Sequence, residues 1–153
     1  MGSTGRGRVG DGDRVAHDDY ELDDDPERLD LDAICDYLST EVYWARWRPL
    51  DVIREQIRTA WRVVGAYAAD GSQVGFARAF SDGFAIAYLA DVYVLDAHRG
   101  HGLGKRIVQR MIDDGPGAKF RWMLHTSDAH GLYRQFGFTG PDPTYLERPN
   151  SFT

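Results

Sequence analysis

Glycine and basic residues alternate in one short segment, which contains Arg99, Gly100, Gly102, Gly104 and Lys105. An apolar stretch precedes the segment, and a helical pattern begins near residue 102. Glycine lets the backbone approach a ligand closely, and a helix N-terminus presents unpaired N–H groups with positive partial charge. The segment therefore predicts a turn that binds phosphate groups. The alternative is an ordinary glycine turn with basic residues on its surface.

Two common phosphate-binding loops do not fit this turn. A Walker A loop needs Ser or Thr after Gly-Lys, whereas Arg106 follows Lys105. A dinucleotide-binding loop needs a third glycine where Lys105 stands, and an acidic residue about 20 positions further on. Met123, Leu124 and His125 occupy that stretch. A phosphate ligand of this turn would therefore belong to another class.

A tyrosine in the last third of the chain could supply a proton. The phenol of Tyr133 has an ordinary pKa of about 10 and could protonate a departing thiolate. Tyr133 also shares a helical stripe with three apolar residues and could instead be part of the core. The stripe consists of Ala129, Leu132 and Phe136. Nearby, His125 could relay protons or be a structural histidine.

Asp91 is an acidic residue within an apolar stretch that ends at Val94. An unpaired buried carboxylate is costly. Asp91 could therefore bind or deprotonate a cationic substrate, or it could pair with an arginine such as Arg78. Strict alternation along a strand predicts that Leu89, Asp91 and Tyr93 share one face, and that Ala90, Val92 and Val94 share the other.

The surrounding pattern predicts an α/β fold of the mixed α+β type. Asp-Gly pairs at 70–71 and 82–83 indicate hairpins between three strands, and a strand-helix-strand unit follows with right-handed parallel crossover. Asp30 and Asp128 are the predicted N-caps of two helices. We expect helices at 31–38, from 49 onward, at 102–114 and at 128–136, and strands at 20–22, 62–68, 73–80, 84–94, 120–125 and 144–147.

Composition limits the function classes. The chain has 153 residues and a net charge of −6, all of which arises within residues 1–30. We expect residues 1–18 to be a disordered tail and residues 19–153 to form a single domain. The neutral body argues against nucleic-acid binding. Cys35 is the only cysteine, and no apolar run approaches the ~20 residues of a membrane span, so we expect a cytoplasmic protein without membrane partners.

The glycine turn resembles the acyl-CoA motif of the GCN5-related N-acetyltransferase (GNAT) family. The resemblance is carried by Val94, Arg99, Gly102 and Gly104, which are separated in turn by four residues, two residues and one residue. Tyr133, followed four residues later by Gly-Phe, resembles the closing segment of the same family. The order of elements agrees over roughly residues 40–140. The resemblance implies the GNAT fold: a mostly antiparallel central sheet, one splayed parallel strand pair and flanking helices.

The resemblance also implies an acetyl-CoA-dependent N-acetyltransferase that acts on a primary amine by direct attack. By analogy with the family, Tyr133 would protonate the CoA thiolate. A backbone N–H of the strand before the glycine turn would stabilise the oxyanion that forms on the thioester carbonyl. The residues that would contact CoA are Val92, Tyr93, Val94, Arg99, Gly100, His101, Gly102, Leu103, Gly104 and Lys105. Asp91 would bind the substrate ammonium or remove a proton. Polyamine acetyltransferases carry two adjacent acidic residues at the positions that correspond to Ala90 and Asp91, and in this chain only Asp91 is acidic.

The acceptor site is predicted from the connector between the first two helices. Tyr43, Trp44 and Trp47 could wall a pocket for a cationic or apolar group, or they could pack beneath the helices. The expected acceptor is a small-molecule or peptide amine, and no metal is expected. Dimers are frequent among relatives, so a homodimer is a candidate state. The alternative function is a non-catalytic acyl-CoA or CoA sensor.

Overall fold

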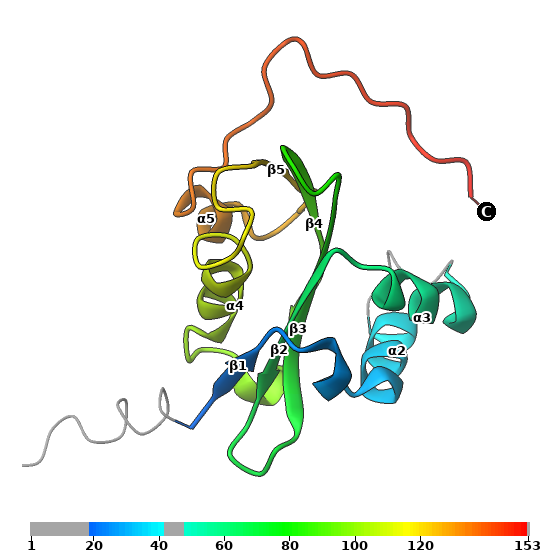
Figure 1. Ribbon diagram of the computed structural model, residues 1–153, viewed down its shortest axis with the longest axis vertical. Coiled ribbons are helices and arrows are strands. Elements are labelled where there is room, and N and C mark those ends of the chain that lie inside the picture. The colour runs from blue at the N-terminus through cyan, green and yellow to red at the C-terminus, as the bar shows by residue number, and fades with distance from the viewer. Residues whose placement is uncertain (1–18, 42–47, 153) are drawn as a thin grey trace, which may run out of the picture.

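The computed structural model describes residues 19–41 and 48–152, which form one five-stranded sheet with helices on both faces (Figure 1). The strand order is β1-β2-β3-β4-β5; the first four strands are antiparallel, and β5 runs parallel to β4. This arrangement confirms the predicted mixed sheet. The strands are β1 (Glu21–Asp23), β2 (Arg62–Tyr67), β3 (Gln73–Ser81), β4 (Ile86–Val94) and β5 (Arg121–Met123).

The helices divide into two groups. In Figure 1, α4 and α5 lie on one side of the sheet and α2 and α3 lie on the other. Their bounds are α2 (Leu31–Thr40), α3 (Leu50–Arg58), α4 (Leu103–Met111) and α5 (His130–Arg134), with short 3-10 turns η1 (Pro26–Arg28) and η3 (Asp96–His98). Asp30 caps α2 as predicted, because its carboxylate accepts a hydrogen bond from the N–H of Ala33 at 3.1 Å.

Two apolar cores follow from this division. The larger core lies beneath α4 and includes Ile107, Met111 and Val64. The smaller core lies beneath α2 and α3 and includes Ile34, Ile53 and further residues of the sheet. Each helix places an apolar stripe on the sheet, as helices at a sheet surface do. The sheet therefore separates two surfaces that can serve different purposes.

A bulge in β4 changes which side chains face each core. Between the pairs Phe76↔Tyr93 and Arg78↔Ala90, β4 has one residue more than β3. Asp91 lies at this bulge with a left-handed φ of 53°. Leu89 therefore packs in the core beneath α4, whereas Tyr93 packs in the core beneath α2 and α3. The prediction that Leu89 and Tyr93 share one face was wrong, because the extra residue reverses the alternation.

The parallel pair β4–β5 opens into a V. The ladder between the two strands ends at Tyr88↔Met123, and β4 continues for six residues to Val94 without a partner on that side. In Figure 1, α4 and α5 lie on the same side of these two strands. The splayed pair predicted from the family resemblance is therefore present.

Two local predictions near the C-terminus were wrong. Residues 144–147 form no strand, and Pro141, Pro143 and Pro149 lack the backbone N–H groups that a ladder needs. Asp128 does not cap α5; the hydroxyl of Thr126 accepts the N–H of Ala129 instead, at 3.1 Å. The predicted tail at residues 1–18 lies outside the described residues.

Candidate active site

The glycine turn adopts a backbone that glycine favours. After η3, Gly100 has a φ of 84° and Gly102 has a φ of 71°, both in the left-handed region. Gly102 occupies the N-cap position of α4, and no side chain caps that helix. A left-handed residue at these positions costs little for glycine and considerably more for residues with a Cβ. The two glycines therefore bend the chain so that α4 begins at the open end of β4.

The backbone N–H groups of this turn are available. Among the hydrogen bonds of the described residues, none is donated by the backbone N–H groups of residues 100–105. The carbonyl of Gly102 accepts the N–H of Arg106 at 3.2 Å, which is the first backbone bond of the helix. Unpaired N–H groups at a helix start carry positive partial charge and attract anions. The geometry thus fits the phosphate cradle that the sequence predicts.

Gly104 keeps the space in front of these groups free. A Cβ at this position would meet only Cγ2 of Val94, at 4.0 Å, which is ordinary contact. The absence of a side chain is therefore not required by packing within the chain. It does leave an open surface between the start of α4 and the end of β4, where a diphosphate and the chain attached to it can lie.

Arg99 is partly engaged by the protein itself. Its Nε donates to the carbonyl of Val94 at 3.0 Å, its Nη2 donates to the Tyr37 hydroxyl at 3.3 Å, and its Nη1 pairs with Asp96 at 2.7 Å. These contacts fix the bend between β4 and α4. The Arg99 side chain remains more than half exposed. It can therefore support the turn and still face an anion at its surface.

The open edge of β4 presents backbone groups in an alternating pattern. The N–H of Leu95 bonds to the carbonyl of Val74 on β3 at 2.8 Å. Backbone groups alternate in direction along an antiparallel strand, so the groups of Tyr93 also point toward β3. Those of Val92 and Val94 point toward the open side, which agrees with the Arg99 contact to Val94. Of the three predicted positions, Val92 and Val94 have the better orientation for a ligand in the V.

Tyr133 faces the same opening from α5. Its side chain is 8% exposed, and its ring packs edge-on against Phe138 with centroids 5.8 Å apart. Burial, with a smaller contribution from the charge of Asp128, raises the pKa of the Tyr133 phenol above its ordinary value. The group therefore stays protonated at neutral pH. Among the described residues, its hydroxyl has no hydrogen-bond partner. Tyr133 is therefore a core residue, and its phenol lines the cleft in the protonated state.

Asp91 is held by two arginines. Its Oδ1 pairs with Nη2 of Arg48 at 2.8 Å, its Oδ2 pairs with Nε of Arg78 at 2.5 Å, and the three side chains are 6%, 6% and 9% exposed in that order. Burial alone would raise the pKa of Asp91, but hydrogen bonds and charge from Arg48 and Arg78 outweigh it and hold that pKa below its ordinary value. Of the roles considered, these contacts support the structural one.

Arg48 is a partner that the sequence analysis missed. It lies just before α3, and its Nη1 also donates to the amide oxygen of Gln56 at 2.8 Å. No spacing rule connects residues 48 and 91, so only the packing of α3 on the sheet reveals the pair. The connector residues Tyr43, Trp44 and Trp47 lie outside the described residues.

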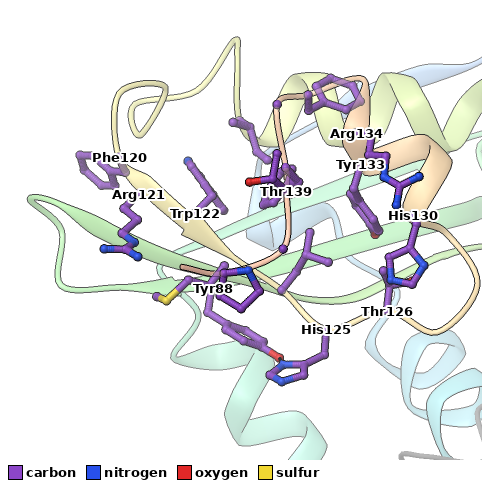
Figure 2. Close-up of a pocket in the computed structure, with 18 of the residues that line it drawn as sticks. Tyr88, Phe120, Arg121, Trp122, His125, Thr126, His130, Tyr133, Arg134 and Thr139 are labelled. Carbon is purple, nitrogen blue, oxygen red and sulfur yellow. Dashed lines mark hydrogen bonds between the residues drawn. The ribbon is translucent and has the colours of Figure 1, made fainter. Parts of the chain in front are cut away.

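A cleft of about 900 Å³ surrounds the free edge of β5 and continues to α5 (Figure 2). Tyr133 lines it from one side of the strands, and Tyr88 and His125 line it from the other, with their rings directed toward each other. The sequence analysis mentioned His125 but not Tyr88. Within the described residues, no group of three or more His, Cys, Asp or Glu side chains could hold a metal ion, and no helix is both long and apolar enough to cross a membrane.

Comparisons with known proteins agree with this geometry. The model of the Acetyltransferase (GNAT) family matches residues 22–138. The chain belongs to the GNAT family of acetyltransferases. This match covers the sheet, the glycine turn and Tyr133, so the predicted family and fold are confirmed.

Individual relatives support the same conclusion. A Gibberella zeae protein named "Putative acetyltransferase FG08082" is 30% identical, over 87% of this chain and 92% of its own length. A crystal structure from Xanthomonas campestris, described as belonging to the GNAT family, has 37% identity and a TM-score of 0.78, covering 86% of this chain and 93% of its own. A Clostridium acetobutylicum acetyltransferase structure with acetyl-CoA has 16% identity and a TM-score of 0.62, covering 85% and 94%, and shows the shared fold.

Proposed function

We propose that this GNAT protein transfers an acetyl group from acetyl-CoA to a primary amine. The observation that carries the proposal is the set of unpaired backbone N–H groups at residues 100–105, at the open end of the β4–β5 pair. When bound, acetyl-CoA supplies the acetyl group as an activated thioester. The family's general use of acetyl-CoA, and its presence in the Clostridium relative, support this choice of donor.

Two segments of the chain would bind different parts of acetyl-CoA. The turn from Arg99 to Lys105 would hold the diphosphate through its N–H groups and positive charge. The open edge of β4 would hold the pantetheine chain, since Val92 and Val94 direct backbone groups there. The N–H of Val92 is the donor that we assign to the developing oxyanion. A rigid backbone N–H suits this purpose because it needs no rearrangement during the reaction.

Tyr133 would protonate the departing thiolate. It is buried and protonated, and it lines the cleft next to the opening between the strands. A thiol has an ordinary pKa of about 8.5, so proton transfer from a positioned phenol to the developing thiolate is feasible as the C–S bond breaks. Asp91 has a different task in this proposal: its two ion pairs hold the bend of β4, and with it the position of Val92.

In this proposal, acetyl-CoA and the amine bind on opposite faces of the sheet. The glycine turn and Tyr133 lie on the side of α4 and α5, where the thioester donor would enter (Figure 1). The amine would approach from the side of α2 and α3, and Tyr43 and Trp44, which lie between these two helices in the sequence, are the proposed contacts for it. The acceptor class that we propose is a small-molecule or peptide amine.

The direct test is a screen of amine acceptors in which release of the CoA thiol is measured. Small diamines, arylalkylamines, amino sugars and short lysine peptides cover the main chemical classes. We expect thiol release that depends on one class of amine, together with a mass increase of one acetyl group on that amine. Acetyl-CoA binding without turnover on any amine would contradict the proposal and would favour the sensor alternative.

A further inference from the structure

Three side chains from distant parts of the sequence form a hydrogen-bonded chain on the amine side of the sheet. The hydroxyl of Tyr88 on β4 lies 2.5 Å from Nδ1 of His125, which follows β5. Nε2 of the same imidazole lies 3.1 Å from Oε2 of Glu147 in the C-terminal segment. The chain of contacts therefore runs from the interior of the cleft outward to solvent.

We propose that Tyr88, His125 and Glu147 form a proton relay that removes the proton released by the acceptor amine during acetyl transfer. The inference rests on the proposed function and extends it to residues that neither the family match nor the glycine turn identifies. The relay also gives the C-terminal segment a role in the reaction, although that segment forms no strand.

The hydrogen-bond partners define the tautomer of His125. An ionised carboxylate only accepts hydrogen bonds, so Glu147 requires the hydrogen of the neutral ring to be on Nε2. Nδ1 then carries a lone pair and accepts the hydrogen of the Tyr88 hydroxyl. The same logic orients the imidazole in a Ser-His-Asp triad, where the carboxylate also stabilises the imidazolium that forms. Here a phenol takes the place of the serine.

The charges around the relay fit this direction of transfer. Hydrogen bonding to His125, followed by its charge, lowers the pKa of Glu147, which is therefore a carboxylate at neutral pH. Burial raises the pKa of Tyr88, and the charges of Tyr145 and Glu147 add to this effect, whereas a hydrogen bond from the backbone of His125 and the charge of Arg78 oppose it. Tyr88 thus stays protonated until its proton moves to His125. Other titratable or charged residues lining the cleft are Asp113, Arg121, His130, Arg134 and Asp142.

The location of the relay suits an incoming amine. Tyr88 is the last residue of β4 that pairs with β5, so its side chain lies where the two strands begin to separate. Tyr133 lies on the opposite side of the same strands (Figure 2). A thioester carbonyl held in the V would therefore have a proton donor on one side and the relay on the other. The proton acceptor and the proton donor do not compete for one position.

The proton balance of the step is complete. The lone pair of the neutral amine forms the new C–N bond, and the electron pair of the C–S bond leaves with sulfur. The amine nitrogen releases one proton to the oxygen of Tyr88 while the Tyr88 proton moves to Nδ1 of His125. Sulfur receives the proton of Tyr133. His125 later returns its extra proton to solvent, and Tyr133 regains one, so no further reactant is consumed.

The test compares pH profiles of kcat/KM for an accepted amine in the wild type and in His125→Gln, Tyr88→Phe and Glu147→Gln. We expect His125→Gln and Tyr88→Phe to lower kcat roughly 10²-fold, in the range of general base catalysis, and to lose the imidazole-dependent acidic limb of the profile. Glu147→Gln should lower kcat by less than His125→Gln does, because the imidazole keeps its proton-accepting Nδ1 but loses the carboxylate that orients it. Matched controls are His130→Gln in the same cleft and Asp142→Asn in the same segment.

A second measurement reports on the relay without turnover. The ¹⁵N resonances of His125 in the wild-type protein distinguish the two neutral tautomers, and we expect the hydrogen on Nε2. A hydrogen on Nδ1 would overturn the relay. So would amine acetylation by His125→Gln with the wild-type kcat and acidic limb. If instead the wild type acetylates no amine, the proposed function itself fails, and the relay fails with it; this outcome is distinct from turnover that is independent of His125.

Discussion

The glycine turn and the Asp91 cluster both concentrate charge close to β4, but they satisfy that charge in opposite ways. At the turn, backbone N–H groups of residues 100–105 have no partner among the described residues, and the surface in front of Gly104 is open. At Asp91, one carboxylate is enclosed by two guanidinium groups, and all three side chains are almost fully buried. The turn therefore keeps its polar groups for a ligand, whereas the Asp91 cluster uses its charges to hold the fold.

We expect the largest effect from a substitution in the Asp91 cluster. Asp91→Asn leaves the buried guanidinium groups of Arg48 and Arg78 without their anion, and we expect the free energy of unfolding to fall by about 3–5 kcal/mol. Urea denaturation measures this change. The matched control is Asp32→Asn, whose partner Arg54 is exposed, and this substitution should change the free energy of unfolding far less than Asp91→Asn does. An Asp91→Asn variant with wild-type stability and a raised KM for the amine would contradict the structural role and would favour a role of Asp91 in binding the amine.

The next effect concerns the proton donor. Tyr133→Phe removes a hydroxyl without a hydrogen-bond partner among the described residues, so we expect little change in stability and a roughly 10²-fold lower kcat. Stopped-time assays of thiol release at saturating amine measure the rate. Tyr67→Phe is the control, because the Tyr67 hydroxyl is also buried and unpaired but belongs to β2, far along the sheet. Equal rates for Tyr133→Phe and the wild type would remove the acid role.

We expect a smaller effect from a substitution in the glycine turn. Gly104→Val adds atoms where the chain has free space, so we expect an unchanged melting temperature. The same atoms would occupy the surface in front of the turn, and we expect the Kd for acetyl-CoA to rise by about tenfold, or about 1.4 kcal/mol. Calorimetric titration checks the value. Gly131→Val on α5, where a Cβ would meet nothing within 4 Å, is the control. Wild-type affinity in Gly104→Val would contradict the cradle.

The smallest effect is a pH dependence of the Asp91 cluster. The pKa of Asp91 is lower in the folded protein than its ordinary value, so its contribution to stability is fully present above the unfolded pKa of about 3.9. That contribution is lost as the pH falls through the folded pKa. The difference in unfolding free energy between the wild type and Asp91→Asn should therefore stay constant from about pH 5 to 7 and shrink below about pH 4. A difference that grows on acidification would contradict the ion pairs.

Features with a local cause could be predicted from the sequence. The Asp-Gly hairpins, the Asp30 cap and the glycine turn depend on residues that are close together in the chain, and the structure contains all of them. The pair of Asp91 with Arg78 was one of two open alternatives, because cross-strand neighbours follow from the hairpin. Arg48 could not be predicted, since its position depends on how α3 packs against the sheet.

Long-range geometry also explains the errors. The bulge at Asp91 depends on how β3 and β4 align, and the alternation of apolar residues alone does not reveal one extra residue. The segment 144–147 has the residue types of a strand, but its flanking prolines and the side-chain contact of Glu147 with His125 give it another arrangement. Tyr88 was missed because its chemistry depends on two residues that are 37 and 59 positions away.

The bulge in β4 affects the backbone of this strand more than its apolar packing. Its extra residue lets Leu89 and Tyr93 enter different cores although an even number of positions separates them. Deleting one of the two bulge residues would restore a regular ladder in which Leu89 and Tyr93 are three positions apart, so they would still face opposite sides and both cores would keep their side chains. Loss of the extra residue should therefore spare the apolar packing on both faces of β4 and remove the irregular backbone at Asp91, beside the open edge of the strand.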